Sequence, residues 1–391
     1  MAKSVKALIT PEVLKWVREK RIELLELDFV AKKLKIDRER LEAWESGTDQ
    51  PTFAQLKRIA KFYKTHISIF YLPKPPTTFH RPVDYRVLPK SKAPDAEQTY
   101  KLKANIVEAH ERRARLIGFY ELLEEPPPKV SVKVNLNEPH RNAAEKITQF
   151  LEFNREKLPK TANPYKALNF WKQTVEAKGI LVCHTSVNTH LSVELQTVRG
   201  FCIAQKPFPV IVVNPKDSPY GRIFTIIHEL VHIALGKSVI QNTGYSETSK
   251  SSLNDTERFC NMVAGEVLVP EDELLEIIDL KTLQEDIPKI SKHFQVSSEV
   301  IMRRLLILKK ISQQKYYAYR KMLLEKYKVR DNNTGTAIPY HTRLLSASGE
   351  YYARSAFSAY YENKITLAEL SAAFYNCSTK HLFKIESEIS T

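Results

Sequence analysis

The stretch Phe224-Thr-Ile-Ile-His228-Glu229-Leu-Val-His232-Ile-Ala-Leu-Gly236 decides how the middle of this chain is interpreted. Apolar residues surround the polar ones over three helical turns, and Gly236 is typical of a residue that ends a helix. Residues four positions apart lie on one helix face, so His228 and His232 are predicted to direct two imidazole nitrogens at one cation. The stretch therefore predicts a buried helix that carries part of a metal site.

Glu229 lies one step around that helix from His228, where its carboxylate is near the cation without being a ligand. A cation such as zinc lowers the pKa of water toward neutrality. We predict that Glu229 is the catalytic base, which takes a proton from the attacking water and later passes it to the leaving amine. The HExxH pattern thus favours peptide hydrolysis with zinc, although manganese and iron(II) also suit a set of two histidines and a glutamate.

A catalytic zinc site needs a third protein ligand beside the two histidines. The longer pattern HExxHxxGxxH is absent, because Leu235 and Ser238 occupy its last two defining positions. The next predicted helix, residues 256–268, offers Glu257 and Glu266, which lie nine positions apart and so near opposite helix faces. Glu257 is nearer the polar loop beside the site, and its position favours it modestly over Glu266.

The whole chain is expected to be multidomain and mainly helical, with an α+β core around the metal helix. Residues 1–72 have the pattern of short helices, for which Asp37 and Thr52 are candidate N-caps and Gly47 a C-terminal stop. Residues 73–128 form a linker and a charged helix, closed by three consecutive prolines at 126–128. Residues 129–280 combine helices with strand-like runs at 180–183, 201–204 and 210–213, and residues 281–391 are helical in pattern.

One pattern recurs three times along the chain, at residues 29–37, 290–297 and 370–378. Each copy has a short amphipathic helix, a tight turn, a polar cap residue and a second helix, which is the pattern of a helix-turn-helix. In the first copy Arg38 and Arg40 are the candidate DNA-binding residues, since arginine can read guanine. The helix that carries them, residues 37–45, also has four acidic residues, so we slightly favour a protein-binding or autoregulatory use of this region over tight DNA reading.

Composition excludes several classes of protein. The 391 residues are 43% hydrophobic, yet no run of about eighteen apolar residues is present, which argues against a membrane span. The four cysteines are scattered, which argues against a disulfide framework and against a thiolate zinc site. These points favour the cytoplasm. The net charge of +15 suits nucleic acid or an acidic partner as well as it suits solvated lysine-rich helices, and nothing in the sequence indicates the oligomeric state.

Two features ahead of the metal helix are candidates for substrate binding. Arg222 is placed to clamp a carbonyl or carboxylate group, although an arginine at a helix start is more often solvated. The strand at residues 210–213 is either ordinary core or an edge strand along which an extended substrate lies, and Asn214 follows it directly. His184 and His190 are expected to be surface or core residues and not ligands.

The stretches 210–214, 222–232 and 257–270 resemble the ImmA/IrrE family of metallopeptidases. Residues 9–16, 41–47, 50–56 and 70–76 resemble the version of that family that carries an N-terminal XRE-type helix-turn-helix domain. The sequence departs from the family at Val231, where glycine is frequent, and at Gly265, which costs about 1 kcal/mol relative to alanine within a helix. Neither departure removes a ligand.

The resemblance implies a thermolysin-like, or gluzincin, zinc fold followed by a helical C-terminal domain. It implies zinc ligands at His228, His232 and Glu257, and so selects Glu257 over Glu266, with Glu229 as the catalytic base. The implied task is site-specific cleavage of a helix-turn-helix repressor or antitoxin-like protein, which relieves repression in stress responses or mobile elements. Two alternatives stay open: a DNA-binding transcription regulator whose peptidase domain is a sensor or inactive, and a toxin-like protein neutralised by a partner chain.

Overall fold

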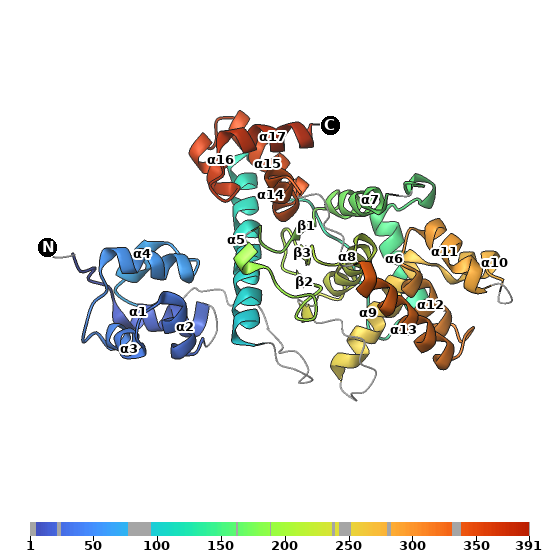
Figure 1. Cartoon of the computed structure of the whole chain (residues 1–391). Helices are drawn as coiled ribbons and strands as arrows, with labels where there is room; N and C mark the ends of the chain where they lie inside the picture. The colour runs from blue at the N-terminus through green and yellow to red at the C-terminus, as the bar shows by residue number, and fades with distance from the viewer. Residues whose placement is uncertain are drawn as a thin grey trace. The chain divides into compact units, whose positions relative to one another are not determined.

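The computed structural model describes residues 5–21, 25–76, 95–161, 163–187, 189–236, 239–241, 252–279, 283–330 and 338–390. The chain divides into two compact units (Figure 1). The first comprises Met1–Glu111 with Asn188–Thr197, and the second comprises Arg112–Val187 with Val198–Thr391. As predicted, the described part is mostly helical and contains one small sheet. Among the described helices, none is both long enough and apolar enough to cross a membrane.

The first unit contains four short helices, α1 (Pro11–Trp16), α2 (Leu27–Leu34), α3 (Arg38–Ser46) and α4 (Phe53–Phe62), with a π-turn at Val17–Arg21 and a 3-10 turn at Ile67–Tyr71. Thr52 begins α4 with the reciprocal hydrogen bonds to Gln55 that define a capping box. Gly47 ends α3 in the left-handed region, with φ 82°, where a residue without Cβ is favoured. Their buried side chains, which include Leu14, Leu41 and Trp44, make a separate core.

The three sequence repeats each fold as two helices around a tight turn. The pairs are α2 with α3, α11 (Leu283–Phe294) with α12 (Ser298–Ile307), and α16 (Leu367–Ala373) with α17 (Thr379–Ile389). Each turn contains a residue in the left-handed region: Lys35 with φ 55°, Gln295 with φ 52° and Tyr375 with φ 61°. The recurring amphipathic pattern therefore corresponds to the same turn geometry at all three places.

The sheet of the second unit has the strand order β1-β3-β2-β4. β1 (Leu181–His184) runs parallel to β3 (Val210–Val213), while β2 (Gly200–Ile203) is antiparallel to both β3 and β4 (Val239–Gln241). Of the two alternatives for residues 210–213, the structure therefore excludes the edge strand and supports the core strand. The backbone groups of β3 are taken by strands on both sides, so an extended substrate cannot pair with it.

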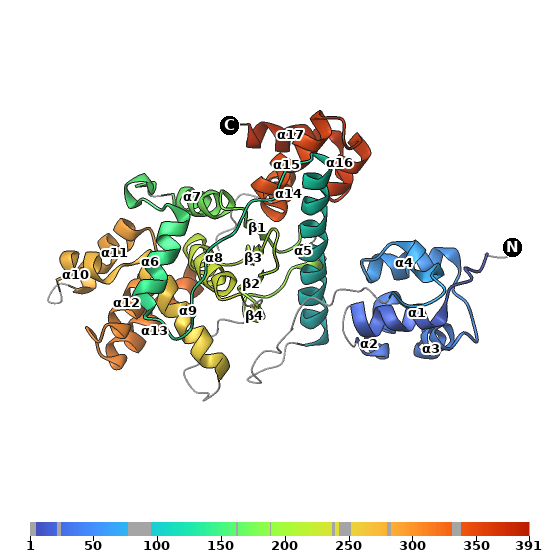
Figure 2. The same cartoon turned by 180° about the vertical axis from the view of Figure 1, so that it is seen from behind.

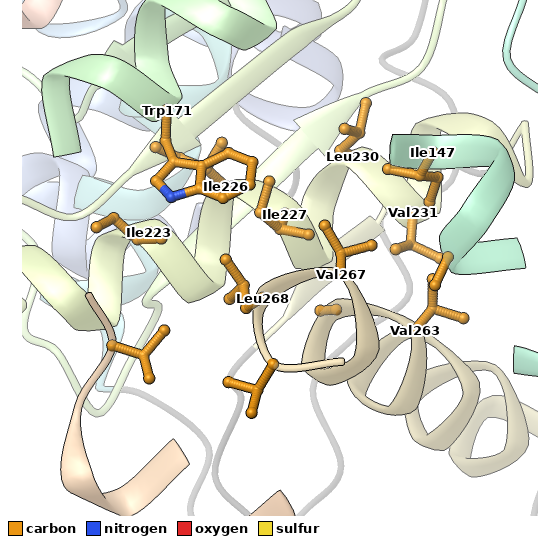
Figure 3. Close-up of a cluster of buried hydrophobic side chains, with 14 of the residues drawn as sticks. Ile147, Trp171, Ile223, Ile226, Ile227, Leu230, Val231, Val263, Val267 and Leu268 are labelled. Carbon is orange, nitrogen blue, oxygen red and sulfur yellow. The ribbon is translucent and has the colours of Figure 1, made fainter. Parts of the chain in front are cut away.

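Helix α8 (Pro219–Ala234), which carries the HExxH stretch, packs across β2 and β3 and against α7 (Pro164–Glu176) and α9 (Ser252–Leu268). Helix α9 in turn contacts α6 (His140–Leu151). Figure 3 shows the side chains that fill this junction. Apolar residues from all four helices meet there, among them Ile147, Trp171, Ile223, Ile226, Ile227, Leu230, Val231, Val263, Val267 and Leu268. Each fully buried branched or aromatic side chain contributes about 1.5–3 kcal/mol, so this core holds α8 firmly in place.

Gly200 permits the close approach of α8 to the sheet. A Cβ at this position would lie 2.4 Å from Cγ2 of Thr225 on α8 and 2.8 Å from the carbonyl oxygen of Val212 on β3. Both distances are shorter than real Cβ contacts, and the second neighbour is backbone that cannot move aside. A glycine in β2 is therefore a requirement of the packing between helix and sheet.

The remaining helices are α5 (Ala96–Leu122), α10 (Glu271–Ile277), α13 (Gln313–Arg330), α14 (Tyr340–Ser348) and α15 (Glu350–Tyr361), with 3-10 turns at Arg155–Lys157 and Thr189–Leu191. In the second unit α14 and α15 pack against β1 (Figure 2). β1 is thus covered at its outer side, and β4 is the other edge of the sheet.

Glu176, the last residue of α7, is a buried carboxylate that joins three elements of the second unit. It accepts hydrogen bonds from the backbone N–H groups of Val182 on β1 (3.3 Å) and Tyr351 on α15 (3.4 Å). Burial raises the pKa of Glu176 to about 7, because the charged carboxylate loses its hydration, although Lys172 opposes this rise.

The raised pKa predicts that stability depends on pH through Glu176. Its unfolded-state pKa is near 4.5, so as pH rises the unfolded chain releases this proton before the folded chain does. The stabilisation that comes from burying the protonated Glu176 is fully present below pH 4.5 and is lost by about pH 7. The free energy of unfolding should fall by about 3 kcal/mol over this range. Urea unfolding between pH 4 and 8 should show this decline in the wild type but not in Glu176→Gln. The variant Glu156→Gln, at an exposed position, is the control that should keep it. Equal pH profiles for all three proteins would contradict the prediction.

Candidate metal centre

Two neighbouring helices bring the three predicted metal ligands together. His228 and His232 lie on the buried face of α8, and Glu257 lies on the first half of α9. The two Nε2 atoms are 3.2 Å apart. Glu257 Oε2 is 3.2 Å from Nε2 of His228, and its Oε1 is 3.0 Å from Nε2 of His232. All candidate ligand atoms of this group lie within 4.8 Å of one another.

This arrangement fits a tetrahedral metal ion. A tetrahedron with metal–ligand distances of about 2.0–2.1 Å has edges of about 3.3 Å, close to the observed spacings of 3.0–3.2 Å. Two imidazoles and one carboxylate are a ligand set of catalytic zinc sites. The three residues would therefore hold zinc with little rearrangement.

The electrostatics of the centre are those of a carboxylate between two imidazoles. Burial alone would raise the pKa of Glu257, but hydrogen bonds and charges from His228 and His232 outweigh it and lower that pKa to about 2. Burial opposes the charged form of His228, yet the Glu257 carboxylate raises its pKa overall. Glu257 is accordingly held as an anion, which is the form that binds a cation.

Glu229, the predicted base, follows His228 and is buried within the second unit. Burial raises the pKa of Glu229, while the charges of His232 and His228 oppose the rise. Neither of its carboxylate oxygens has a hydrogen-bond partner of ordinary geometry within the described ranges. The Cys202 thiol also opposes the rise in the pKa of Glu229. Because a thiol is a weak donor, the carboxylate stays available to a water molecule or a substrate.

Glu266, the rival third ligand, lies in a different environment. Its carboxylate forms an ion pair with Arg304 of α12 and accepts a hydrogen bond from the backbone N–H of Glu271 at 3.1 Å. His140 and Arg141 of α6 approach it at 3.9 and 3.8 Å. The structure thus groups Glu257 with the two histidines and engages Glu266 in fastening α9 to its neighbours.

The two candidate substrate-binding residues both point inward. Asn214 is buried, donates a hydrogen bond to the carbonyl of Val198 (2.9 Å) and accepts one from the N–H of Lys216 (3.0 Å). Arg222 is buried rather than solvated, and its guanidinium lies over the ring of Tyr165, 5.4 Å from the centroid. These contacts give Asn214 a structural task, and a role for either residue in substrate binding stays a prediction.

Sequence reasoning missed one polar neighbour of the centre. The Sγ atom of Cys260 on α9 lies 3.6 Å from Nδ1 of His232. In the sequence, the scattered cysteines argue only against a disulfide framework and a thiolate zinc site. The spacing from Glu257 to Cys260 is a signal that could have found it, because residues three apart share a helix face.

In the first unit, the two candidate DNA-binding arginines are engaged by other side chains. Arg38 donates hydrogen bonds to Glu42 (2.8 Å) and Asp28 (2.9 Å). The guanidinium of Arg40 lies over the ring of Trp44, 5.7 Å from its centroid. Base reading by Arg38 would require the loss of two ion pairs.

Comparison with known families matches two parts of the chain. Residues 175–306 match the IrrE N-terminal-like domain of the peptidase M78 family, and residues 17–70 match a helix-turn-helix family. No curated protein and no solved structure gave a significant match. The first region contains the HExxH helix and Glu257, and the second contains α2, α3 and α4.

Metal analysis tests the ligand set. We expect about one zinc per purified chain in the wild type, and loss of that zinc in His232→Ala and Glu257→Ala because each removes one of three ligands. Glu266→Gln is the matched control, since it changes a glutamate of the same helix and should keep the metal. Mass spectrometry of the purified proteins measures this. If zinc is retained in Glu257→Ala but lost in Glu266→Gln, Glu266 is the third ligand and Glu257 is not.

Proposed function

We propose that this chain, in which a helix-turn-helix domain precedes an IrrE N-terminal-like peptidase domain, is a zinc endopeptidase that cleaves a protein substrate at a specific site. The observation that carries the proposal is the convergence of His228, His232 and Glu257 within 4.8 Å on two packed helices. Glu229, a buried carboxylate next to His228 in the same helix, supplies the base that such a centre needs.

In this mechanism the chain's own residues orient the reactants and move one proton. Zinc, when bound by His228, His232 and Glu257, supplies Lewis-acid polarisation and makes water more acidic. Glu229 accepts a proton from the attacking water on a carboxylate oxygen and later delivers it to the nitrogen of the leaving amine. The raised pKa of Glu229 suits both steps, because a carboxyl group whose pKa is nearer to neutral pH both accepts and releases a proton more readily.

We propose that the peptidase domain is of the thermolysin-like type and that substrate approaches the β4 side of the sheet. The order of an HExxH helix followed by a helix that carries the third ligand, a glutamate, supports the first point. For the second, β3 is interior and β1 is covered by α14 and α15, whereas β4 is an edge with β2 as its partner. A peptide in extended form pairs with such an edge through its backbone.

The substrate class follows from the resemblance and from the helix-turn-helix domain. We propose that the substrate is a helix-turn-helix repressor or antitoxin-like protein whose cleavage relieves repression. Arg38 and Arg40 already interact with other side chains of the domain, and α3 is acidic. Both observations support a protein-binding use of this domain. The alternative, a DNA-binding regulator with a sensory or inactive peptidase domain, is favoured by the helix-turn-helix match and by the net charge of +15.

Replacement of Glu229 should abolish cleavage without removing the zinc. We expect Glu229→Gln to keep about one zinc per chain and to lose at least about a hundredfold in cleavage rate, since the amide cannot accept the proton. New protein N-termini in a lysate of the source cells, identified by mass spectrometry, should appear with the wild type and be absent with the variant. Equal cleavage by both proteins would rule out Glu229 as the base.

Measurement of DNA binding at one salt concentration tests whether the helix-turn-helix domain reads a DNA sequence. We expect the full-length chain to bind duplex DNA without sequence preference, and Arg38→Ala to change affinity by less than about twofold, because that side chain is held by Asp28 and Glu42. The control is Lys32→Ala, which removes an exposed charge of α2. Sequence-specific binding that Arg38→Ala weakens at least about tenfold would instead favour the DNA-binding regulator.

A further inference from the structure

The positive charge of this chain is concentrated in one segment. Residues 303–330 contain ten lysine and arginine residues and one glutamate, so they contribute +9 to the net charge of +15. The rest of the chain has 50 lysine and arginine residues against 44 acidic residues and contributes only +6. No aspartate or glutamate lies between Glu299 and Glu325. Such a segregation of charge is typical of a surface that binds a polyanion.

Two arginines of this segment are used inside the fold. The segment forms the second half of α12 and all of α13, which pack against each other in the second unit (Figure 1). Arg304 is buried, forms an ion pair with Glu266 and donates from Nε to the carbonyl of Val269 at 3.1 Å. Nε of Arg320 lies 3.3 Å from Oε1 of Glu299. These guanidinium groups therefore fasten helices to one another.

The lysines of the same segment are turned to solvent. Lys309 and Lys310 directly follow α12, and Lys315 and Lys321 lie on α13. All four are exposed, and none of them forms an ion pair with any residue of the described ranges. Their charges are therefore available to a partner molecule.

The face of α13 between its two exposed lysines carries no negative charge. Lys315 and Lys321 are about 120° apart around the helix axis, since an α-helix turns by about 100° per residue. Tyr316 lies on the opposite side, where it is buried in the core of the second unit. The residues that lie between the two lysines are all exposed and uncharged: Gln314, Ala318 and Met322. A phosphate group can thus approach both ammonium groups without meeting a carboxylate of this face.

We propose that Lys309, Lys310, Lys315 and Lys321 form a lysine surface that binds the phosphate backbone of duplex DNA without reading its sequence. An ammonium group is a point charge without a fixed fork of donors, which suits a uniform row of phosphates. Base edges and the carboxylates of an acidic protein are better recognised by the planar fork of arginine, and Arg304 and Arg320 are engaged within the fold. Duplex DNA carries one charge per about 1.7 Å, so it can neutralise several lysines at once.

The lysine surface belongs to the unit that contains the peptidase match, whereas the helix-turn-helix match lies in the first unit. DNA bound there holds the peptidase close to a repressor that is itself bound to DNA. This use of the surface rests on the proposed function. The binding itself needs neither zinc nor cleavage.

The test is the salt dependence of DNA binding by the full-length protein. Fluorescence anisotropy with a labelled duplex of about 20 base pairs and arbitrary sequence gives the slope of log affinity against log salt concentration. We expect the double variant Lys315→Gln with Lys321→Gln to reduce that slope by about 2, because two phosphate contacts are lost. Binding at about 100 mM salt should weaken at least about tenfold. The double variant Lys309→Gln with Lys310→Gln should act in the same way.

The matched control is the double variant Lys129→Gln with Lys133→Gln, which removes the same charge from two exposed positions of the same unit. It should leave the slope unchanged, and thermal unfolding verifies that every variant is folded. If the control reduces the slope as much as the variants of the lysine surface do, binding follows net charge alone and the proposal is overturned. A wild type that binds no DNA overturns it as well.

A second ligand distinguishes DNA from an acidic protein. Polyglutamate, added at the same concentration of charges, should bind more weakly than the duplex because its charges are less densely spaced. If it binds at least as tightly and loses affinity in the Lys315→Gln, Lys321→Gln variant, the surface takes an acidic protein and the assignment to DNA is overturned. Because these measurements report binding alone, a chain that holds no zinc or cleaves no protein would overturn the proposed function and leave this result unaffected.

Discussion

The packing of α8 between the sheet and α9 is the constraint on which the second unit depends. Gly200 lets α8 approach β2, and the apolar residues of α8 then meet α7, α9 and α6 in one core. The histidines lie on the same buried helix, so their positions are fixed by that core and do not depend on a bound metal. Preorganisation of this kind reduces the cost of bringing a metal and a substrate into register.

Helix α9 is held at both of its ends by charge. Near its start Glu257 is bound between two imidazoles, and near its end Glu266 is paired with Arg304, whose Nε also donates to the carbonyl of Val269 at 3.1 Å. Removal of one partner from a buried ion pair costs about 3–5 kcal/mol, because the other charge is left uncompensated. The ion pair of Glu266 therefore stabilises the end of α9 that lies away from the centre.

The two departures from the resembled family, Val231 and Gly265, are both buried in the second unit. Val231 is fully buried and packs with Ile147 and Val263 in the core, so its extra bulk is directed away from solvent and into the helix junction (Figure 3). A Cβ at Gly265 would meet nothing nearer than Cδ of Arg304 at 3.8 Å. Space does not require glycine there, and nothing in the structure explains its presence.

By itself, the sequence determined the local features: the spacing of His228 and His232 on one helix face, the cap at Thr52 and the three helix-turn-helix repeats. These depend on residues a few positions apart, whose geometry is set by helix periodicity and turn chemistry. Only the tertiary structure decided that residues 210–213 form an interior strand, that Arg222 is buried and that Cys260 lies behind His232. Strand neighbours, burial and contacts between helices are set by segments far apart in the chain, and no local pattern encodes which distant surface a side chain will meet.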